Sequence, residues 1–313
     1  MNDIDLTVII VNYNTRQLLD ICIESVIKNY NNISYEIIVV DNASMDESAE
    51  LVEKKYKSVH LIKNKSNIGF AQANNQASIH ANGRYVLALN SDTIIINNEF
   101  IKVIHYMDKH DDVGIATGKI LNYDKSFQCP YHKFPGFIET IFNQSLFRIY
   151  NFNSLLSGKT RKKLSQDQVR KVDWVTGAYL IIRKTLLDEG RIFDKNIFMY
   201  YEDTLLCKRI HTLGYNVVYL PYAPIIHYHG GSAHKIRSKS IYFSFLGSQR
   251  YIEKVYGMLA LKCYNKIVGS LWTSFALLFS LLFFIPSERI QKKKKLFIDL
   301  IQMKNSPKNE PNF

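Results

Sequence analysis

The chain has 313 residues, of which 47% are hydrophobic and 13% aromatic, and Lys plus Arg exceed Asp plus Glu by 40 − 28 = 12. This composition excludes a disordered or fibrous chain, and the basic excess favours anionic partners such as phosphate-bearing substrates or acidic lipid surfaces. Because the first 100 residues carry no basic excess (8 Lys or Arg against 12 Asp or Glu) and much of the positive charge lies late, in Lys159–Lys163, His234–Lys239 and Lys292–Lys295, we do not expect a nucleic-acid-binding face.

Neither the cysteines nor the first residues indicate export. The four cysteines are isolated in the sequence, without disulfide or zinc-type spacing, which is typical of a reducing compartment. The chain begins MNDIDLTVII, with two acidic residues and no basic stretch before the apolar run, so it does not resemble a signal peptide. We therefore expect this part of the chain to lie in the cytoplasm.

Apolar runs alternate with amphipathic segments from the start of the chain. Leu6–Val11 and Glu36–Val40 are continuous β-branched runs of the kind buried on both faces of a sheet, and Thr15–Lys28 between them has helical apolar spacing. Further elements are predicted in order: a helix from the capping box Ser44–Glu47 to about Tyr56, a strand at Val59–Ile62, a helix at Phe70–Ala81 and a strand at Tyr85–Leu89. This alternation predicts an α/β fold with a mostly parallel sheet and helices on both faces.

The pattern is looser from Phe100 to Arg170, where we expect helices and loops. Strand character returns at Val172–Arg183, followed by a helix at Glu202–Leu213 that Gly214 ends and a strand at Val217–Leu220. We expect one domain over residues 1–256, a helical segment over 257–304 and a disordered tail over 305–313.

Polar residues follow three of the predicted strands: Asn12 and Asn14 after the first, Asp41 after the second, and Asn90-Ser91-Asp92 after the fourth. Such residues are also common in turns and helix caps. In parallel α/β sheets, however, ligands bind beyond the carboxyl ends of the strands, and acidic groups gathered there favour a cation or a hydrogen-bonding ligand between them. The sequence contains neither a dinucleotide fingerprint nor a phosphate loop of the GxxxxGK[ST] type.

Six segments together resemble the successive motifs of family 2 glycosyltransferases, in particular the rhamnosyltransferase-like bacterial members. They are VIIVNYNT, VVDNASMDES, NKSNIGFAQANNQ, LALNSDT, WVTGAYLIIR and FMYYEDTLLCKR, and they lie in family order over roughly residues 5–235. The resemblance implies a GT-A fold, inverting transfer of a sugar from a UDP- or dTDP-sugar, and a divalent cation, Mg²⁺ or Mn²⁺.

The resemblance also implies roles for individual residues. Asp203 is the general base, with Glu202 beside it, although both would also suit the start of a helix. Donor-binding residues are Asn12, Asn14, Asp41, Asn67, Gly69, Asn74, Asn90 and Asp92. Trp174, Gly177 and Ala178 form the floor under donor and acceptor, with ordinary core packing as the other interpretation of Trp174.

The metal site departs from the family pattern of two aspartates separated by one residue. Here the stretch is Asn90-Ser91-Asp92, so Asp92 is the main expected ligand, and the amide lowers the affinity without abolishing the site. By strand phase His227 is the second expected ligand, with His229 as the alternative. The basic residues at 234–237 suit either a loop that closes over the diphosphate or a solvated loop.

Ile267–Ile285 is a run of 19 residues without a formal charge. As a helix it would span about 28 Å at roughly 1.5 Å per residue, close to the thickness of a bilayer core. Basic residues flank both ends, Lys262 and Lys266 before and Lys292–Lys295 after, which would place both flanks in the cytoplasm. We therefore expect an in-plane or re-entrant helix on the cytoplasmic face rather than a single crossing, with the membrane surface as a partner.

The resemblance favours an acceptor that is a lipid-linked or growing saccharide of the cell surface, with rhamnose as a candidate sugar. The alternative is a membrane-anchored sugar-nucleotide-binding protein with weakened catalysis, which Asn90 favours and the intact Asp92, Asp203 and His227 oppose. A nucleotidyltransferase would need a Gly-rich basic loop near residue 12, which the sequence lacks. The fold does not fix the donor sugar, the linkage or the oligomeric state.

Overall fold

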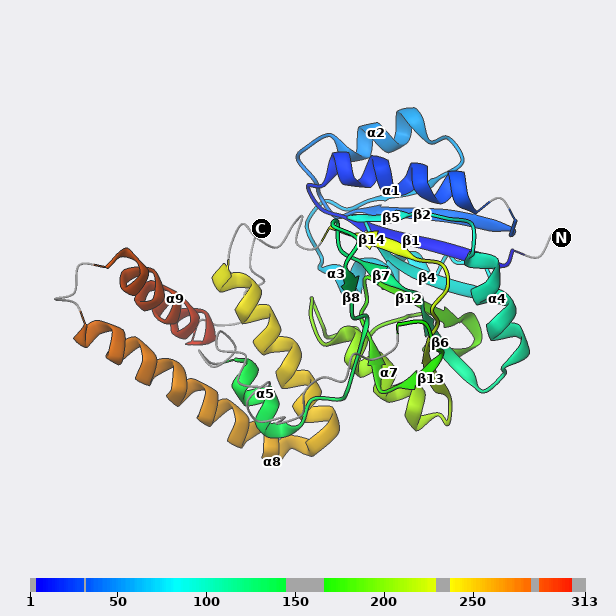
Figure 1. Cartoon of the computed structure of the whole chain (residues 1–313). Helices are drawn as coiled ribbons and strands as arrows, with labels where there is room; N and C mark the ends of the chain where they lie inside the picture. The colour runs from blue at the N-terminus through cyan, green and yellow to red at the C-terminus, as the bar shows by residue number, and fades with distance from the viewer. Residues whose placement is uncertain (1–3, 31, 145–165, 229–236, 283–286, 306–313) are drawn as a thin grey trace.

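The computed structural model describes residues 4–30, 32–144, 166–228, 237–282 and 287–305 (Figure 1). The strands are β1 (Leu6–Asn12), β2 (Tyr35–Asp41), β3 (His60–Lys63), β4 (Tyr85–Asn90), β5 (Thr93–Ile95), β6 (Val113–Thr117), β7 (Ile120–Leu121), β8 (Phe127–Gln128), β9 (Tyr131–His132), β10 (Arg170–Val172), β11 (Trp174–Val175), β12 (Tyr179–Arg183), β13 (Asn216–Tyr219) and β14 (Ile225–His227). The helices are α1 (Arg16–Asn29), α2 (Ser48–Lys55), α3 (Phe70–Ser78), α4 (Phe100–Lys109), α5 (Phe137–Asn143), α7 (Glu202–Thr212), α8 (Arg237–Leu281) and α9 (Glu288–Asn305).

Within the described residues, the main sheet has eight strands in the order β10-β13-β6-β12-β4-β1-β2-β3. The block β4-β1-β2-β3 is parallel, as predicted. In the other half β13 is also parallel to β6, but β12 is antiparallel to both β4 and β6, and β10 is antiparallel to β13, so the sheet is mixed. A continuous apolar run indicates that a strand is buried on both faces, but it does not reveal the direction of the strand.

A second difference lies between residues 100 and 170, where we expected helices and loops. The fully buried strand β6 lies in this segment and pairs with β12 and β13 near the middle of the sheet. It has only five residues, which is too short for a periodicity to stand out from its surroundings.

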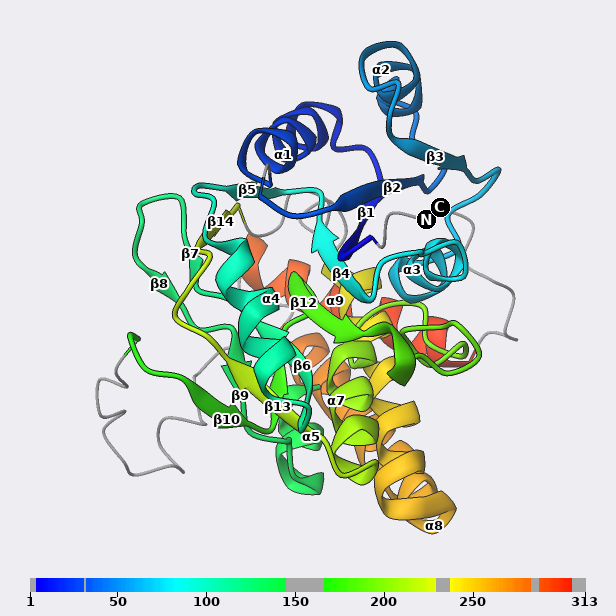
Figure 2. The same cartoon turned by 90° about the vertical axis from the view of Figure 1, so that its right-hand side faces the viewer.

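Alternate residues of the central strands face two separate apolar clusters. Val8 and Ile10 point to the side covered by α1 and α4, whereas Ile9 points to the side covered by α3 and α7. Figure 2 shows α1 and α3 on opposite sides of β1. Full burial of a Val, Leu or Ile side chain stabilises the folded state by about 1.5–3 kcal/mol. The two clusters therefore fix which strand residues face each side of the sheet, and with them the direction of the side chains just beyond the strand ends.

The start of α2 differs from the predicted capping box. The helix begins at Ser48, preceded by Glu47 in a left-handed conformation (φ 62°), and no side chain of the N-cap residue caps it. Instead, Asp46 Oδ1 accepts a hydrogen bond of 3.2 Å from the Ser48 amide. The hydroxyl of Ser44, the residue we expected to cap the helix, turns towards β1.

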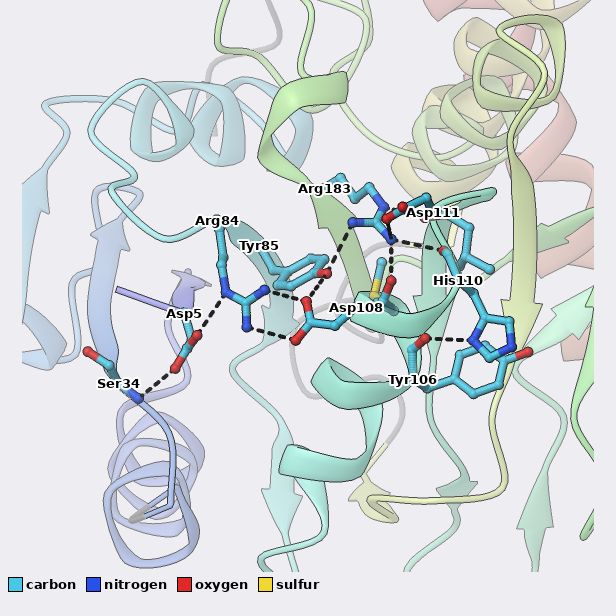
Figure 3. A network of polar contacts seen from close by, with 11 residues as sticks. Asp5, Ser34, Arg84, Tyr85, Tyr106, Asp108, His110, Asp111 and Arg183 are labelled. Atoms are coloured by element: carbon cyan, nitrogen blue, oxygen red, sulfur yellow. Dashed lines mark hydrogen bonds and ion pairs between the residues drawn. The ribbon is translucent and has the colours of Figure 1, made fainter. Parts of the chain in front are cut away.

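A polar network fastens the end of the sheet that lies opposite the predicted site (Figure 3). Arg84, just before β4, donates to Asp5 Oδ1 at 2.8 Å and holds both carboxylate oxygens of Asp108 on α4. The Tyr85 hydroxyl donates to Asp108 Oδ1 at 2.7 Å, and Arg183 on β12 donates to that hydroxyl at 3.1 Å. These contacts tie β1, β4, β12 and α4 together on an edge that carries none of the predicted site residues.

Helices α8 and α9 extend away from the sheet as a hairpin (Figure 1). Helix α8 is interrupted at Gly257 (φ 85°, ψ 176°), next to the domain boundary that the sequence predicts at residue 256. The part before this break contacts the turn that precedes α7, and the part after it packs against both α5 and α9. Both parts belong to one apolar cluster with the sheet.

One side of the apolar run at 267–285 is packed inside the protein. Val268, Trp272, Ala276 and Phe279 are buried, and Trp272 Nε1 donates to the carbonyl oxygen of Gln144 at 2.9 Å. Among the residues that the structure describes, no helix has both the length and the apolarity needed to cross a membrane. Packing within the protein therefore accounts for the apolar residues on one side of the segment that we interpreted as a membrane helix.

Candidate active site

The polar ends of β1, β2 and β4 lie side by side. Asn12 is paired with Asp41 in the β1–β2 register, and Val11 with Asn90 in the β1–β4 register. The buried Asn12 amide donates to Asp41 Oδ1 at 3.1 Å and to Ser44 Oγ at 3.0 Å. The structure thus brings these predicted donor-binding residues together.

Two hydroxyl residues that we did not predict connect the strand ends. Thr15 Oγ1 donates to Asn12 Oδ1 at 2.6 Å and lies 2.9 Å from Ser91 Oγ, which links the end of β1 to the end of β4. All three side chains are buried. Their only signal in the sequence is their position directly after strands, which also fits an ordinary turn.

Asp41 is held in a fixed orientation by its own loop. Its Oδ2 accepts a hydrogen bond of 3.0 Å from the Ser44 amide, and its side chain is buried. Ser44 Oγ also accepts from the amide of Asn14 at 3.0 Å, and Asn14 Oδ1 accepts from the Met45 amide at 2.7 Å. Asn14 adopts a left-handed conformation (φ 54°), which asparagine tolerates better than most residues.

Asn67 is hydrogen-bonded to Asn42, a residue that we did not predict as part of the site. Asn42 Nδ2 donates to Asn67 Oδ1 at 2.8 Å, while Asn42 Oδ1 accepts from Asn64 Nδ2 at 3.0 Å and from the Ile68 amide at 3.1 Å. Asn67 Oδ1 in turn accepts from the Gly69 amide at 2.9 Å. Asn67 therefore acts here as part of a rigid loop between β3 and α3.

Position 69 requires a glycine because of its backbone conformation and its close approach to Phe198. Its φ is 89°, and a Cβ built on it would lie 2.6 Å from the carbonyl oxygen of Phe198. The nearby Asn74 donates to the Phe70 carbonyl at 2.9 Å, and its buried Oδ1 has no hydrogen-bond partner among the described residues. Phe198 precedes α7, so this loop also links the donor side to the predicted catalytic pair.

A carboxylate, an imidazole and an amide meet beyond β4. His227 Nε2 lies 3.2 Å from Asp92 Oδ1 and 3.4 Å from Asn90 Nδ2, and Asp92 and His227 are both buried. His227 is paired with Thr93 across β14 and β5, which brings the residue next to Asp92. His229 lies outside the described residues, as do positions 234 and 235 of the basic loop.

His227 is oriented by Gln128 on β8, which we did not predict. His227 Nδ1 lies 3.3 Å from Gln128 Oε1. A proton on Nδ1 donated to this oxygen leaves the Nε2 lone pair facing Asp92, the orientation in which an imidazole can bind a metal ion. Among the described residues there is no group of three His, Cys, Asp or Glu side chains that could hold a metal. A cation here would need the Asn90 oxygen, water or a ligand's oxygens to complete its shell.

Asp203 lies in the first turn of α7 and is fixed from two directions. Its Oδ2 accepts from the Gly177 amide at 3.0 Å, and its Oδ1 accepts from the Thr204 amide at 2.7 Å. The carbonyl oxygen of Ala178, the next residue of the predicted floor, accepts a hydrogen bond of 3.1 Å from the backbone amide of Asn90. The Gly177–Ala178 segment therefore joins the predicted base to the strand end that carries Asp92.

Trp174 lies on the short β11–β9 pair. Its Nε1 donates to the carbonyl oxygen of Lys133 at 2.8 Å, and its ring centroid lies 4.6 Å from that of His132. The side chain is partly buried and packs against the larger apolar cluster. Its described contacts are with β9 rather than with Asp203.

Glu202 and Asp203 have raised pKa values. Glu202 is buried, its Oε2 has no hydrogen-bond partner among the described residues, and burial together with the neighbouring Asp203 charge raises its pKa to about 8. Burial also raises the pKa of Asp203, against the hydrogen bonds from Gly177 and Thr204 that favour its charged form. An aspartate with a raised pKa is a better proton acceptor than an ordinary one.

Replacing Glu202 with Gln should change how stability depends on pH. Below pH 4.5, the ordinary pKa of a glutamic acid, Glu202 is protonated whether the chain is folded or not. Between that value and about pH 8 the unfolded chain loses the proton while the folded chain keeps it, so the native protein is progressively destabilised as the pH rises. We expect the Tm of Glu202→Gln to exceed that of the native chain by a margin that grows across this range in thermal melts. A margin independent of pH would contradict a neutral, buried Glu202.

The turn before α7 is held by α8. Tyr200 and Tyr201 are both left-handed (φ 69° and 66°), a conformation that costs about 1 kcal/mol or more per residue. Phe198 stacks on Phe243 of α8 with ring centroids 4.5 Å apart, and a Cβ on Gly247 would overlap the Tyr200 carbonyl oxygen. The close approach of α8 therefore stabilises the turn that presents Asp203.

The fold is of the α/β class, with buried polar side chains gathered at the ends of β1, β2 and β4 and an acidic pair at the start of α7. Residues 7–186 match the profile described as "Glycosyl transferase family 2", and the chain belongs to this family. The match ends before α7, so the placement of Asp203 and His227 rests on the geometry above.

Similar proteins agree with this family. The chain is 28% identical to the low-salt glycan biosynthesis hexosyltransferase Agl10 of Haloferax volcanii, over 68% of this chain and 64% of that protein. It is 22% identical to the N-acetylglucosaminyl-diphospho-decaprenol L-rhamnosyltransferase of Mycobacterium tuberculosis, over 61% of this chain and 66% of that protein. The chain thus spans just under two thirds of the length of these curated relatives. Among solved structures, the mannosyltransferase PcManGT of Pyrobaculum calidifontis, in complex with GDP-Man and Mn²⁺, has the same fold (TM-score 0.52, 16% identity, 95% of this chain and 84% of that one).

Proposed function

We propose that this protein transfers a sugar from a nucleoside diphosphate to a hydroxyl group with inversion at the anomeric carbon. The observation that carries the proposal is the position of Asp203. Its carboxylate accepts a hydrogen bond from the backbone amide of Gly177, and the carbonyl oxygen of the next residue, Ala178, accepts one from the backbone amide of Asn90. One short segment therefore connects the proposed base to the strand end that carries the Asp92–His227 pair. A donor diphosphate near Asp92 and an acceptor hydroxyl near Asp203 would then lie on either side of the reacting carbon.

In the proposed reaction, Asp203 accepts the proton of the acceptor hydroxyl as that oxygen attacks the anomeric carbon. A new carbon–oxygen bond forms on one face while the bond to the nucleoside diphosphate breaks on the other, and the leaving diphosphate takes the bonding electrons. A single displacement of this kind inverts the anomeric centre. The raised pKa of Asp203 makes it a stronger base than an ordinary aspartate.

Asp92 and His227 are the residues that would hold a divalent cation, Mg²⁺ or Mn²⁺, with Asn90 beside them. Their carboxylate oxygen and imidazole nitrogen lie 3.2 Å apart, so one ion could contact both after a small adjustment. A bound cation would neutralise negative charge on the leaving diphosphate. The structurally similar mannosyltransferase was solved in complex with GDP-Man and Mn²⁺, which supports this assignment.

Asp41 is the residue proposed to recognise the base of the donor. Its carboxylate is held by Asn12 and by the Ser44 amide, and it can accept a further hydrogen bond from the N3–H of uracil or thymine. This chemistry favours a UDP- or dTDP-sugar, with rhamnose as a candidate.

The proposed acceptor is a lipid-linked or growing saccharide of a cell-surface polysaccharide, met at the cytoplasmic face of the membrane. The name of the Mycobacterium tuberculosis relative, which specifies a diphospho-decaprenol acceptor, supports an acceptor carried on a lipid.

A donor panel tests the proposed function. The purified chain is incubated with UDP-, dTDP- and GDP-sugars in Mg²⁺ or Mn²⁺, and both the thermal shift and the release of nucleoside diphosphate are measured. We expect one uracil- or thymine-containing donor to raise the Tm, since a ligand at a hundred times its Kd stabilises by about 2.7 kcal/mol, and to be hydrolysed slowly. A Tm shift without any turnover would indicate the weakened binding protein instead, and no response to any donor would contradict the proposal.

A further inference from the structure

The free end of the α8–α9 hairpin exposes several leucines. The side chains of Leu277, Leu278 and Leu281 are 60%, 48% and 69% exposed, whereas Ala276 and Phe279, on the other side of the same turns, are buried. A folded protein does not need to gather three leucines on one solvent-facing patch, and such patches commonly mark a site of contact with another molecule.

The basic run Lys292–Lys295 lies on α9, alongside the same end of α8 that carries these leucines. Lys293 Nζ is 5.6 Å from the ring centroid of Phe279, and Phe279 stacks on Phe297 of α9, so the first turns of α9 run alongside the last turns of α8. Lys295 is exposed, and Lys292 is largely exposed although it lies 2.6 Å from Glu288. We call the exposed Leu277, Leu278 and Leu281 with Lys292–Lys295 the hairpin tip.

Charge on the whole hairpin has one dominant sign. Residues 258–305 contain eight Lys or Arg and two Asp or Glu, a balance of 8 − 2 = +6. Such a surface repels a second copy of itself, and the cores of protein interfaces are depleted of lysine. Exposed leucines at the end of one helix, with lysines on the helix paired with it, match instead the boundary of a bilayer, where apolar side chains enter the acyl region and ammonium groups meet anionic headgroups.

We propose that the hairpin tip docks on the surface of an anionic phospholipid bilayer, with the three leucines inserted and the lysines on the headgroups. This inference deepens the proposed function, since a membrane surface is where a lipid-linked acceptor would be met, but it requires no turnover. The hairpin does not cross the membrane in this arrangement. Its buried residues, including Trp272 and Phe279, keep their contacts within the protein.

Docking by the tip also places the catalytic domain. Helix α8 runs from Phe243 and Gly247, which contact the turn before Asp203, through the break at Gly257 to the leucines. The site and the tip are therefore joined by one helix, and the membrane contact is made at the end distant from the sheet (Figure 1).

Vesicle flotation of the full-length chain tests this proposal in the absence of donor. Vesicles of phosphatidylcholine alone are compared with vesicles that also contain phosphatidylglycerol, at low and high salt. We expect binding to the anionic vesicles, weakened by salt because the lysine contribution is screened. Lys292→Gln with Lys295→Gln should weaken binding by about fivefold per lysine. Leu277→Ser with Leu281→Ser should weaken it by at least about tenfold.

The matched control is Leu213→Ser, which removes a leucine of similar exposure (53%) at the end of α7, far along the chain from the tip. It should bind like the native chain. Because all the substituted side chains are exposed, far-ultraviolet circular dichroism and melting curves should be unchanged. Donor hydrolysis should also be unchanged, which separates this proposal from the proposed function.

Three results would overturn the docking proposal. The first is equal binding to neutral and anionic vesicles, and the second is an unaltered affinity of the leucine and lysine variants. The third is a concentration-dependent dimer in sedimentation analysis that the leucine variants abolish, without any vesicle binding, which would make the tip a contact between copies of the chain.

Discussion

Asp203→Asn is expected to lower the rate of sugar transfer by about 10²–10⁴-fold, the range that a positioned general base contributes. The amide keeps the size of the side chain and can still accept the Gly177 hydrogen bond of 3.0 Å, but it cannot take the proton of the acceptor hydroxyl. Donor binding, measured as a thermal shift, should remain near that of the native chain. The measurement is the rate of product formation with the best donor of the panel.

Two further variants test whether the loss of transfer is specific to Asp203. Glu202→Gln removes the neighbouring carboxylate, which is buried and has a pKa raised to about 8, so a loss as large as that of Asp203→Asn would assign the base to Glu202 instead. Asp111→Asn, at a side chain that is 97% exposed, should have no effect on transfer. Retained turnover in Asp203→Asn would contradict its role as the base.

Asp92→Asn is expected to raise the concentration of Mn²⁺ needed for half-maximal transfer by at least about a hundredfold. A hard cation depends on carboxylate oxygens, and substitutions even in the surroundings of a metal ligand cost about 10–100-fold in affinity. Chelation by EDTA should abolish transfer in the native chain, and added Mn²⁺ should restore it. The measurement is a titration of activity with Mn²⁺ and Mg²⁺.

Asn90→Asp is the matched variant, and it should strengthen metal binding where Asp92→Asn weakens it. It recreates a pair of aspartates separated by one residue, next to His227 Nε2, which now lies 3.4 Å from Asn90 Nδ2. We expect about tenfold tighter Mn²⁺ binding, since it adds a charged oxygen ligand where an amide now lies. If EDTA leaves transfer intact and neither substitution shifts the titration, the metal part of the proposed function is wrong.

The first four strands and the gathering of their polar ends could be predicted from the sequence. Long β-branched runs such as Leu6–Val11 can only be buried, and the carboxyl ends of parallel neighbours must share one edge. Asn12, Asp41 and Asn90 therefore lie side by side, as the pairings show. The family resemblance supplied what periodicity could not, namely the placement of Asp203 and His227 near that edge.

Other features depend on contacts that the sequence does not encode locally. The antiparallel direction of β12 is set by its pairing with β4 and β6, which are distant in sequence, and the partners of Ser44 are determined by how β1 and β2 align rather than by the helix that follows. Gln128 lies in a strand of only two residues, so no pattern marks it as the partner of His227. The apolar run after residue 266 could not be assigned from hydropathy, since a helix buried between protein neighbours is as apolar as one in lipid.

Helix α8 has a practical consequence for shortened forms of this protein. A chain that ended before residue 237 would keep all the strand-end residues but lose Phe243, Gly247 and Tyr251, which contact the strained turn next to Asp203. A chain that ended at residue 256 would keep them, yet it would uncover Phe245, whose ring lies 4.9 Å from that of Trp272. Deleting the hairpin would therefore confuse loss of the proposed membrane contact with damage to the interior, and point substitutions at exposed positions are the cleaner way to separate the two.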